Sequence, residues 1–464
     1  MEEYQKFLKS KRISVEPCGF DVEREMLNKN AFEWQKDIVQ WALKKGRSAL
    51  FEDCGLGKTI QQLMWADEVF KHTNKPILIV APLAVAEQTK SEGEKFGIEV
   101  KVCREQRDIV DGINITNYEI LEHFDCSVFG GVVLDESSIL KSFTSKTKQL
   151  IIEKFAKTQY KLSCTATPSP NDYMELGNQA EFLGIMSRSE MLATFFTHDG
   201  GEVSKWRLKG HAKHRFWEWL ANWAVVLTNP SDLGYDNADY KLPPMQIFEH
   251  TVKSEQHESN GQLLLGYIAK TLSERRDARK ESLISRCEKT AELIASNPDE
   301  QWLIWCDLNA EADMLKKIIS GAVEVRGSDK PEYKTEMLKG FSDGKVKYLI
   351  TKPSIAGFGL NWQCCHNMIF VGLSDSYEMM YQAIRRCYRF GQEKAVNVHI
   401  VISEAEGAVK SNIERKERQA EEMQKQMVKY TKDLLTAEIR GTQREVIEYN
   451  PQIEMIIPKW LKGA

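Results

Sequence analysis

The sequence lacks an uninterrupted apolar run of the roughly eighteen residues or more that a membrane-spanning helix needs. Its first residues, MEEYQKFLKSKR, also lack the apolar core of a signal peptide. The sequence therefore shows neither of the usual signs of membrane insertion or secretion. We therefore expect a protein of the cell interior that makes no membrane contact.

The chain also has little net charge, and its cysteines lack the spacing of a metal site. Its 67 acidic and 63 basic residues give a formal net charge of -4, so any nucleic-acid surface must be local. Ten cysteines are scattered along the chain, and the tightest group, Cys364-Cys365-His366, lacks the ligand spacing of a zinc site. We expect buried thiols in a reducing compartment rather than a metal centre.

Short apolar runs recur along the 464 residues in two series. Each run is bounded by turn residues and followed by a helical or loop stretch, which is typical of parallel strands covered on both faces. Two series predict two α/β lobes. The first contains SALF at 48, PILIVAP at 76, GVVLDE at 131 and YKLSCTATP at 160; the second contains QWLIWC at 301, VKYLITK at 346, NMIFVG at 367 and VNVHIVIS at 396.

A Pro-Pro pair in NADYKLPPMQ, residues 237–246, fits neither a helix nor a central strand. It predicts a hinge between a first lobe over 1–240 and a second lobe over 241–404. Residues 187–240 fit neither series of strands, so we expect them to form a helical insertion on the first lobe.

The expected insertion mixes basic and aromatic residues. Basic groups beside stacking rings can hold a nucleic-acid strand, and this stays open for the basic stretch with Lys205, Arg207, Lys209, Lys213 and Arg215. The apolar residues that follow have the spacing of the buried stripe of an amphipathic helix, which we favour for Phe216, Trp219, Leu220 and Trp223.

Residues 405–464 are predicted to form a C-terminal helical extension, because their apolar residues keep a spacing of three or four. The stripe is short for self-association, so we favour a helix that packs back across both lobes over a short coiled coil. It consists of Val409, Ile413, Ala420, Met423, Met427, Tyr430 and Leu434.

A phosphate-binding loop is predicted within FEDCGLGKTIQQ, residues 51–62, which follows a strand and opens a helical pattern. Backbone N–H groups can close around phosphate oxygens at the turn made by Gly55, Leu56 and Gly57. Lys58 can reach the β and γ phosphates, and the hydroxyl of Thr59 can bind Mg²⁺. Glu52 stands where the general pattern has its first glycine, and the alternative is a turn rich in glycine.

Two adjacent carboxylates, Asp135 and Glu136, end the predicted strand in VVLDESS. Ligands of open α/β sheets bind at the carboxyl ends of the strands. Asp135 is suited to hold Mg²⁺ through water, and Glu136 to orient or deprotonate the attacking water. A solvated turn is the alternative, but the phosphate loop upstream favours a site for ATP and Mg²⁺.

Arg386 and Arg389 lie in QAIRRCYRFGQ, residues 382–392, which contains no carboxylate. If this stretch is helical, both guanidinium groups lie on one face and need an anion. Arginine can neutralise the charge that develops on a γ-phosphate, an effect of roughly 10³ to 10⁵ in rate. The two arginines can act on a nucleotide at Lys58 only if the lobes close on it.

With these motifs together, the chain resembles the superfamily-two helicase-like ATPases, and within them the Swi/Snf-type DNA translocases. The resemblance covers about residues 30 to 405 and implies two tandem RecA-like lobes. The similar blocks, in the order of the family, are FEDCGLGKT (motif I), APLAVAEQ (Ia), ITNYEIL (Ib), DESSILKS (II), TATPSPNDYMEL (III), LIWCD (IV), VRGSDKPEYKTEMLKGF (the segment after IV), TKPSIAGFGLNWQ (V) and QAIRRCYRFGQ (VI).

The resemblance assigns further residues to the nucleotide. Gln35 in FEWQKDIVQ matches the glutamine that reads adenine, with a surface glutamine as the alternative. Gln382 belongs with the two arginines to motif VI, which faces the nucleotide. In motif V, Gly359 is expected to line the interlobe cleft together with Gly357 and Asn361.

Two residues match positions near the DNA backbone, Thr116 in motif Ib and Lys141 just past motif II. For Lys141 the alternative is a solvated lysine. Ser138 stands where many relatives have histidine, so the connection from motif II to motif III must be made differently or more weakly. Ser163-Cys164 before motif III is also nearer the wording of the helicase branch.

The resemblance implies an ATP hydrolase that uses Mg²⁺ and moves along or remodels DNA, duplex or branched, gripping mainly its backbone. The minimal size implies a bacterial or phage member that acts as a monomer in the cytoplasm of a bacterium or an infected host, with a protein partner left open. The alternatives are a strand-separating helicase, a nucleotide-controlled DNA clamp with little turnover, and an RNA-directed motor.

Overall fold

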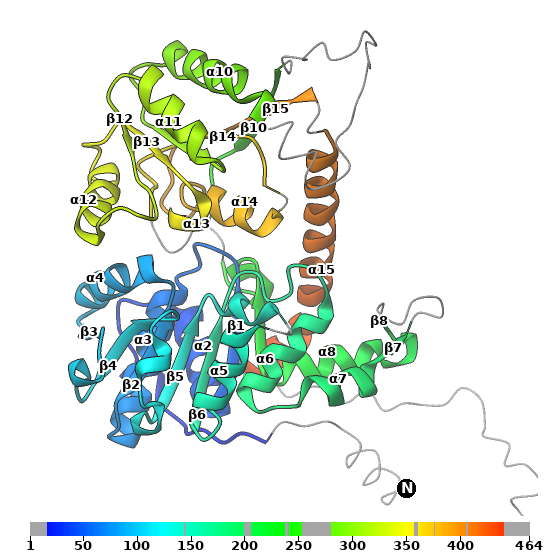
Figure 1. The fold of residues 1–464 in the computed structure, drawn as a ribbon. Helices are drawn as coiled ribbons and strands as arrows, with labels where there is room; N and C mark the ends of the chain where they lie inside the picture. Colours follow the sequence, from blue (N-terminus) through cyan, green and yellow to red (C-terminus); the bar gives the residue numbers. More distant parts are fainter. Residues whose placement is uncertain are drawn as a thin grey trace, which may run out of the picture.

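The fold consists of two α/β lobes, drawn one above the other in Figure 1. The structure is a computed structural model that describes residues 16–142, 145–198, 206–236, 240, 242–252, 280–356, 361–374, 376–404 and 407–439. Each lobe is built on its own sheet of parallel strands. The expected pair of parallel α/β lobes is therefore confirmed.

Lobe one contains a seven-stranded sheet in the order β3-β4-β2-β5-β6-β1-β9. All its strand pairs are parallel, so the carboxyl ends of the strands meet at one edge. The strands are β1 (Arg47–Glu52), β2 (Ile77–Ala81), β3 (Val100–Val102), β4 (Ile113–Asn117), β5 (Gly131–Asp135), β6 (Tyr160–Cys164) and β9 (Ala224–Leu227).

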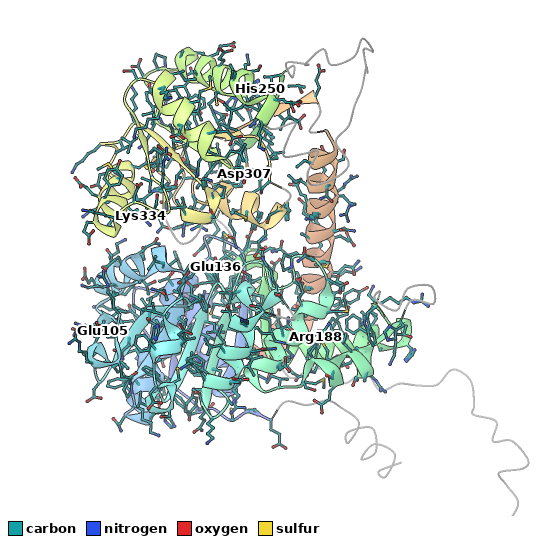
Figure 2. The ribbon with its side chains drawn as sticks, in the orientation of Figure 1. Glu105, Glu136, Arg188, His250, Asp307 and Lys334 are labelled. Carbon is teal, nitrogen blue, oxygen red and sulfur yellow. The ribbon has the colours of Figure 1, made fainter. Side chains whose placement is uncertain are left out.

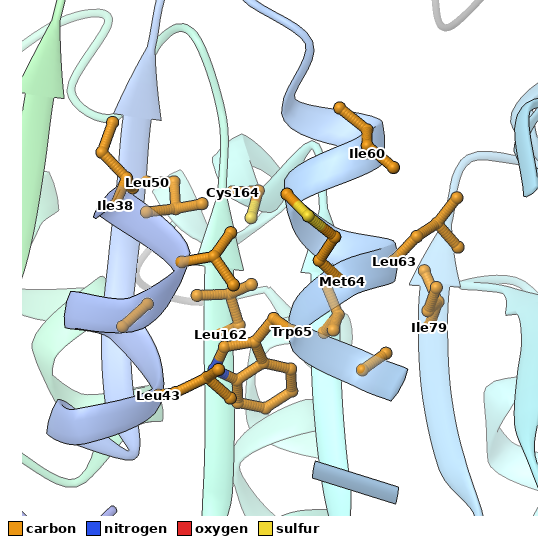
Figure 3. Packing of buried hydrophobic residues seen from close by; sticks show 14 of the residues in the cluster. Ile38, Leu43, Leu50, Ile60, Leu63, Met64, Trp65, Ile79, Leu162 and Cys164 are labelled. Atoms are coloured by element: carbon orange, nitrogen blue, oxygen red, sulfur yellow. The ribbon is translucent and has the colours of Figure 1, made fainter. Parts of the chain in front are cut away.

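Helices cover both faces of this sheet, as the continuous apolar strands require. On one face, residues of α2 (Glu33–Lys45), α3 (Lys58–Thr73) and α4 (Ala86–Phe96) share a core with the strands, part of which Figure 3 shows around Trp65 and Leu162. The other face packs against α5 (Lys146–Lys154), α6 (Leu176–Leu183), α7 (Arg188–Phe195) and α8 (Lys213–Ala221).

Lobe two repeats the arrangement with six parallel strands in the order β10-β15-β14-β11-β13-β12. One face packs against α10 (Leu283–Ser296) and α11 (Asn309–Ile318), and the other against α12 (Pro331–Ser342), α13 (Pro353–Ala356) and α14 (Tyr377–Ile384). The strands are β10 (Met245–Val252), β11 (Trp302–Cys306), β12 (Ala322–Glu324), β13 (Tyr348–Thr351), β14 (Asn367–Val371) and β15 (Val396–Ser403).

The segment expected as an insertion belongs in part to the sheet of lobe one. β9 pairs with β1, so the last part of the segment is an edge strand, a role that its short length and the helical stripe before it concealed. The only antiparallel pair among the described strands joins β7 (Phe196–His198) to β8 (Trp206–Leu208). The predicted apolar stripe is confirmed, since all four of its side chains are buried: Phe216, Trp219, Leu220 and Trp223.

The basic stretch before that stripe has mixed surroundings. Arg207 and Arg215 are exposed, whereas the ammonium group of Lys209 donates to the carbonyl oxygens of Ala193 and Thr194 and so satisfies the end of α7. Lys205 lies outside the described residues. A contact of this stretch with nucleic acid stays a prediction.

The long helix α15 (Gly407–Ile439) connects the two lobes, as Figure 1 shows. Val409 and Ile413 near its start are buried in the core of lobe two, whereas Met427 and Leu435 are buried in the cores of lobe one. A helix that packs back across the lobes is therefore confirmed. The predicted stripe was inexact at its end: Leu435 is fully buried, Leu434 only half-buried, and Tyr430 is exposed and stacks on Trp217.

This pair of adjacent leucines allows a matched test of the packing of α15. Leu435→Ala is expected to lower the free energy of unfolding by about 2 to 4 kcal/mol, because it leaves a cavity in the core of lobe one. Leu434→Ala removes the same atoms from a half-buried position and should cost clearly less. Denaturant unfolding of both variants measures the difference, and equal losses would contradict the packing described.

Most of the cysteines lie in the interior of the described part of the chain. Seven of the ten cysteines are buried there: Cys103, Cys126, Cys164, Cys287, Cys306, Cys365 and Cys387. Over the same ranges, no cluster of three or more His, Cys, Asp or Glu side chains has the arrangement of a metal site. No helix in the described part of the chain combines the length and apolarity needed to cross a membrane.

Candidate active site

The predicted phosphate loop lies between β1 and α3, at the carboxyl edge of the sheet of lobe one. Gly55 and Gly57 have φ angles of 90° and 73°, a region that glycine adopts without strain. Gly57 immediately precedes Lys58 and Thr59, the first residues of α3. Backbone N–H groups at a helix start attract anions, so this turn can hold a phosphate.

Gln35 holds this loop from α2. Its side chain is 3% exposed, which excludes the alternative of a surface glutamine. Nε2 donates to the carbonyl of Leu56 at 3.0 Å, and Oε1 accepts from the backbone nitrogen of Phe32. A Cβ on Gly57 would lie 2.4 Å from Nε2, so this contact requires glycine. Reading of adenine by Gln35 stays a prediction.

Lys58 points back over the loop. Its ammonium group donates to the carbonyl oxygens of Glu52 at 2.7 Å and Asp53 at 3.0 Å. Glu52 itself is buried, and burial raises the pKa of its carboxyl group to about 7, with Lys58 and a hydrogen bond from Gln61 opposing the shift. The hydrogen bonds that Lys58 would exchange for a phosphate are thus made to backbone oxygens in the described part of the chain.

We expect Lys58→Ala to weaken ATP binding at least about tenfold, because it removes a charge-assisted hydrogen bond to phosphate. Equilibrium titration with a fluorescent ATP analogue measures the change. Lys71→Ala is the matched control: Lys71 is on the same helix, but it pairs with Asp67 and Glu68 in a half-exposed position. Wild-type affinity in Lys58→Ala would contradict the assignment of the loop.

Asp135 ends β5 and Glu136 follows it, at the same edge of the sheet as the loop; Figure 2 labels Glu136 where the two lobes face each other. Oδ1 of Asp135 accepts from Nε2 of Gln62 at 2.7 Å, and burial raises the pKa of this carboxyl group. Glu136 has φ 52° and ψ 52°, a left-handed backbone conformation that is unusual for glutamate. The chain therefore turns at Glu136 and does not continue in the direction of strand β5. Burial, reinforced by the charge of Asp135, raises the pKa of Glu136 to about 7.

The motif with the two arginines is not a continuous helix. α14 ends at Ile384, so Arg386 and Arg389 lie in the turns that follow it, and the condition that would place both on one helical face is not met. Arg386 is 4% exposed, and its Nε donates to the carbonyl of Gln382 at 2.9 Å. Its positive charge opposes the rise that burial causes in the pKa values of Asp135 and Glu136, so Arg386 lies close enough to act on both carboxyl groups of lobe one.

Arg389 reaches the phosphate loop from lobe two. A Cβ built on Gly55 would lie 3.1 Å from the backbone nitrogen of Phe390 and 3.5 Å from Cβ of Arg389. Arg389 donates to Asn361 in motif V through one guanidinium nitrogen. Burial and the charge of Arg386 lower its pKa to about 10, so it remains a cation at neutral pH.

Several buried polar atoms at this boundary have no partner within the described structure. They are both amide atoms of Gln382, which is 1% exposed, and Nε of Arg389. Buried polar groups without partners are uncommon in proteins and call for an explanation, and at a boundary between a phosphate loop and two arginines a bound ligand provides one. Amide and guanidinium groups match the sugar hydroxyls and phosphate oxygens of a nucleotide, so the residues present fit ATP.

Comparison with known proteins agrees with this two-lobed site. Residues 34–198 match the family model of the SNF2-related domain, and residues 285–391 match that of the helicase conserved C-terminal domain. The first range contains the phosphate loop, Asp135 and Glu136, the second contains Arg386 and Arg389, and together they span more than half of the chain. The chain belongs to the SNF2-related, helicase-like ATPases.

Individual members of this family are similar at low identity. The DNA annealing helicase and endonuclease ZRANB3 of Mus musculus is 22% identical over 82% of this chain and 39% of its own length, so the chain spans about two fifths of that relative. The uncharacterized ATP-dependent helicase YqhH of Bacillus subtilis is 24% identical over 79% of this chain and 74% of its own. A Sulfolobus solfataricus SWI2/SNF2 ATPase core solved in complex with dsDNA has a TM-score of 0.42 at 19% identity, covering 82% of this chain and 90% of that chain.

Three residues of this SNF2-related site escaped the sequence analysis. Arg385 forms an ion pair with Asp53 of the phosphate loop at 2.6 Å, and both side chains are largely buried. The hydroxyl of Tyr381 also donates to Asp53, and the guanidinium group of Arg385 lies over the ring of Tyr381. Three arginines were visible in the motif and Asp53 in the loop, but no sequence signal paired them. Arg385 is therefore the arginine that pairs with the carboxylate of the phosphate loop.

The predicted DNA residues of this SNF2-related chain lie in different surroundings. Thr116 lies in β4 at 1% exposure, and its hydroxyl donates to the carbonyl of Cys103, so the structure does not bring it to the surface. Lys141 is partly exposed but forms an ion pair with Glu378 of α14, so it is not a freely solvated lysine. DNA contact stays a prediction for both. Gly357 and Gly359 lie outside the described residues.

The connection between motifs II and III is indeed made without a histidine at Ser138. Gln179 of α6 donates to the carbonyl of Ser137 at 3.0 Å and accepts from the hydroxyl of Ser163 at 2.6 Å. The hydroxyl of Thr165 lies 3.5 Å from Oε2 of Glu136. A glutamine from a neighbouring helix therefore provides the connection that the sequence left unexplained.

Proposed function

We propose that this chain is a DNA-dependent ATPase that couples ATP hydrolysis to translocation on, or remodelling of, duplex DNA. The observation that carries the proposal is the composite site. Lys58, Asp135 and Glu136 of lobe one lie against a segment of lobe two that carries Arg386 and Arg389. Such a site is complete only when the lobes are together, so nucleotide chemistry and lobe movement are linked.

The residues have separate roles in this proposal. Lys58 and the N–H groups of the loop bind the phosphates, and Gln382 offers its unpartnered amide to the nucleotide. Glu136 accepts a proton from the attacking water, while Arg386 and Arg389 neutralise negative charge at the transferred phosphate. Thr59 and Asp135 would hold Mg²⁺, which supplies further charge neutralisation when bound.

DNA is the proposed activator, supported by the family and by the DNA annealing activity named for the mouse relative. Lys141, whose side chain is 41% exposed, is the proposed contact to a backbone phosphate. We place the lobes at 1–240 and 241–404 and the extension at 405–464, and we propose a monomer. The similarity to a Bacillus subtilis protein, which covers 74% of that protein, supports action in the cytoplasm of a bacterium or an infected host.

The test is steady-state ATP hydrolysis without nucleic acid and with single-stranded, duplex and branched DNA or RNA. We expect duplex or branched DNA to raise the rate at least about tenfold. A rate that DNA leaves unchanged would favour the clamp, and preferential stimulation by RNA would favour the RNA motor. Displacement of a triplex strand without unwinding of a duplex separates a translocase from a strand-separating helicase.

A further inference from the structure

Glu378, in the first turn of α14, connects lobe two to two separate segments of lobe one. Its Oε2 accepts from the ammonium group of Lys141, just past motif II. Its Oε1 lies 3.3 Å from the hydroxyl of Thr167 in motif III. One carboxylate of the arginine-bearing lobe therefore contacts both the segment just past motif II, the motif that contains Glu136, and motif III.

A short series of polar contacts leads from Glu378 to Glu136. The backbone nitrogen of Thr167 donates to the hydroxyl of Thr165 at 3.1 Å, and that hydroxyl lies 3.5 Å from Glu136. A change at Glu378 can thus reach Glu136 through these contacts.

The two partners of the ion pair differ in their access to solvent. The side chain of Lys141 is 41% exposed, whereas that of Glu378 is 8% exposed. An anion that arrives from solvent can therefore reach the ammonium group of Lys141 without entering the interior. A DNA phosphate is such an anion, and it would compete with Glu378 for the same cation.

We propose that Glu378 is a positioning residue that signals DNA binding to the catalytic carboxylate. In the absence of DNA it holds Lys141 and Thr167. A DNA phosphate takes Lys141 away from it, and the freed carboxylate changes its contact with Thr167, which moves motif III beside Glu136. This inference rests on the proposed function and identifies the residue through which DNA binding changes the rate of ATP hydrolysis.

The experiment measures ATP hydrolysis against duplex DNA concentration at one low salt concentration. In Glu378→Gln we expect the half-saturating DNA concentration to fall about three- to tenfold, because phosphate no longer displaces a carboxylate. The unstimulated rate should rise, so the ratio of stimulated to unstimulated rates should fall at least about threefold. An unchanged or higher half-saturating concentration would overturn the inference.

Lys141→Gln tests the same pair from its exposed side. It also releases Glu378, so the unstimulated rate should rise, but the half-saturating DNA concentration should increase about tenfold and its salt dependence should weaken. The double variant should match Lys141→Gln in DNA concentration dependence, because Glu378 acts on DNA only through Lys141. Additive effects of the two substitutions would contradict this.

Two controls separate signalling from general effects. Glu421→Gln removes one negative charge from an exposed position on α15 and should leave the half-saturating concentration unchanged. Glu378→Asp keeps the charge and should restore most of the stimulation ratio if the ion pair matters. Wild-type protein that DNA fails to stimulate overturns the proposed function, whereas normal stimulation with unaffected variants overturns only the role of Glu378.

Discussion

Arg389→Ala is expected to reduce ATP turnover about a thousandfold or more while leaving ATP binding close to wild type. Arg389 is a partly buried cation beside the phosphate loop, and its Nε is buried without a partner within the described residues. Its proposed partner is the negative charge that develops on the transferred phosphate, which is greatest in the transition state. Removing it should therefore lower kcat far more than affinity.

The neighbouring arginine gives a matched control. Arg385 is largely buried as well, but it pairs with the carboxylate of Asp53, so Arg385→Ala should disturb the contact between the lobes and lower kcat much less. Steady-state hydrolysis gives kcat, and titration with a fluorescent ATP analogue gives affinity. Turnover of Arg389→Ala within about tenfold of wild type would remove this residue from the mechanism.

The sequence predicted the parts of the site that depend on local pattern. The phosphate loop and the Asp135-Glu136 pair each follow a continuous apolar strand, and parallel strands bring their carboxyl ends to one edge. That rule places Lys58 and Glu136 on the same side of lobe one without any knowledge of distant contacts. The strand runs and the buried side of α8 were predictable for the same reason.

Contacts between the lobes could not be predicted in this way. The pairs Asp53–Arg385 and Lys141–Glu378 join residues far apart in the chain, and nothing in either local pattern names the partner. Tertiary packing also determines where α14 ends, at Ile384, and why the side chain of Leu435 is buried and that of Leu434 is not. Sequence periodicity thus located the two halves of the site, while their docking decided which arginine meets which anion.

Glu136→Gln is expected to lower kcat about 10²- to 10⁴-fold and to preserve ATP binding, because the amide keeps the shape of the side chain but cannot accept the proton of water. The pH profile offers a second readout. Burial and the charge of Asp135 raise the pKa of Glu136 to about 7, so the active, deprotonated form is lost as the pH falls below this value. Wild-type kcat/KM should therefore rise with pH through about 7, and this rise should disappear in the variant.

Glu175→Gln is the matched control for that profile. Burial also raises the pKa of Glu175 to about 7, but its carboxylate accepts from Asn171 rather than facing the phosphate loop. The Glu175→Gln variant should retain both wild-type turnover and the rise of kcat/KM with pH. If Glu136→Gln kept the rise and Glu175→Gln lost it, the proton acceptor would be Glu175, and the left-handed turn after β5 would need a different explanation.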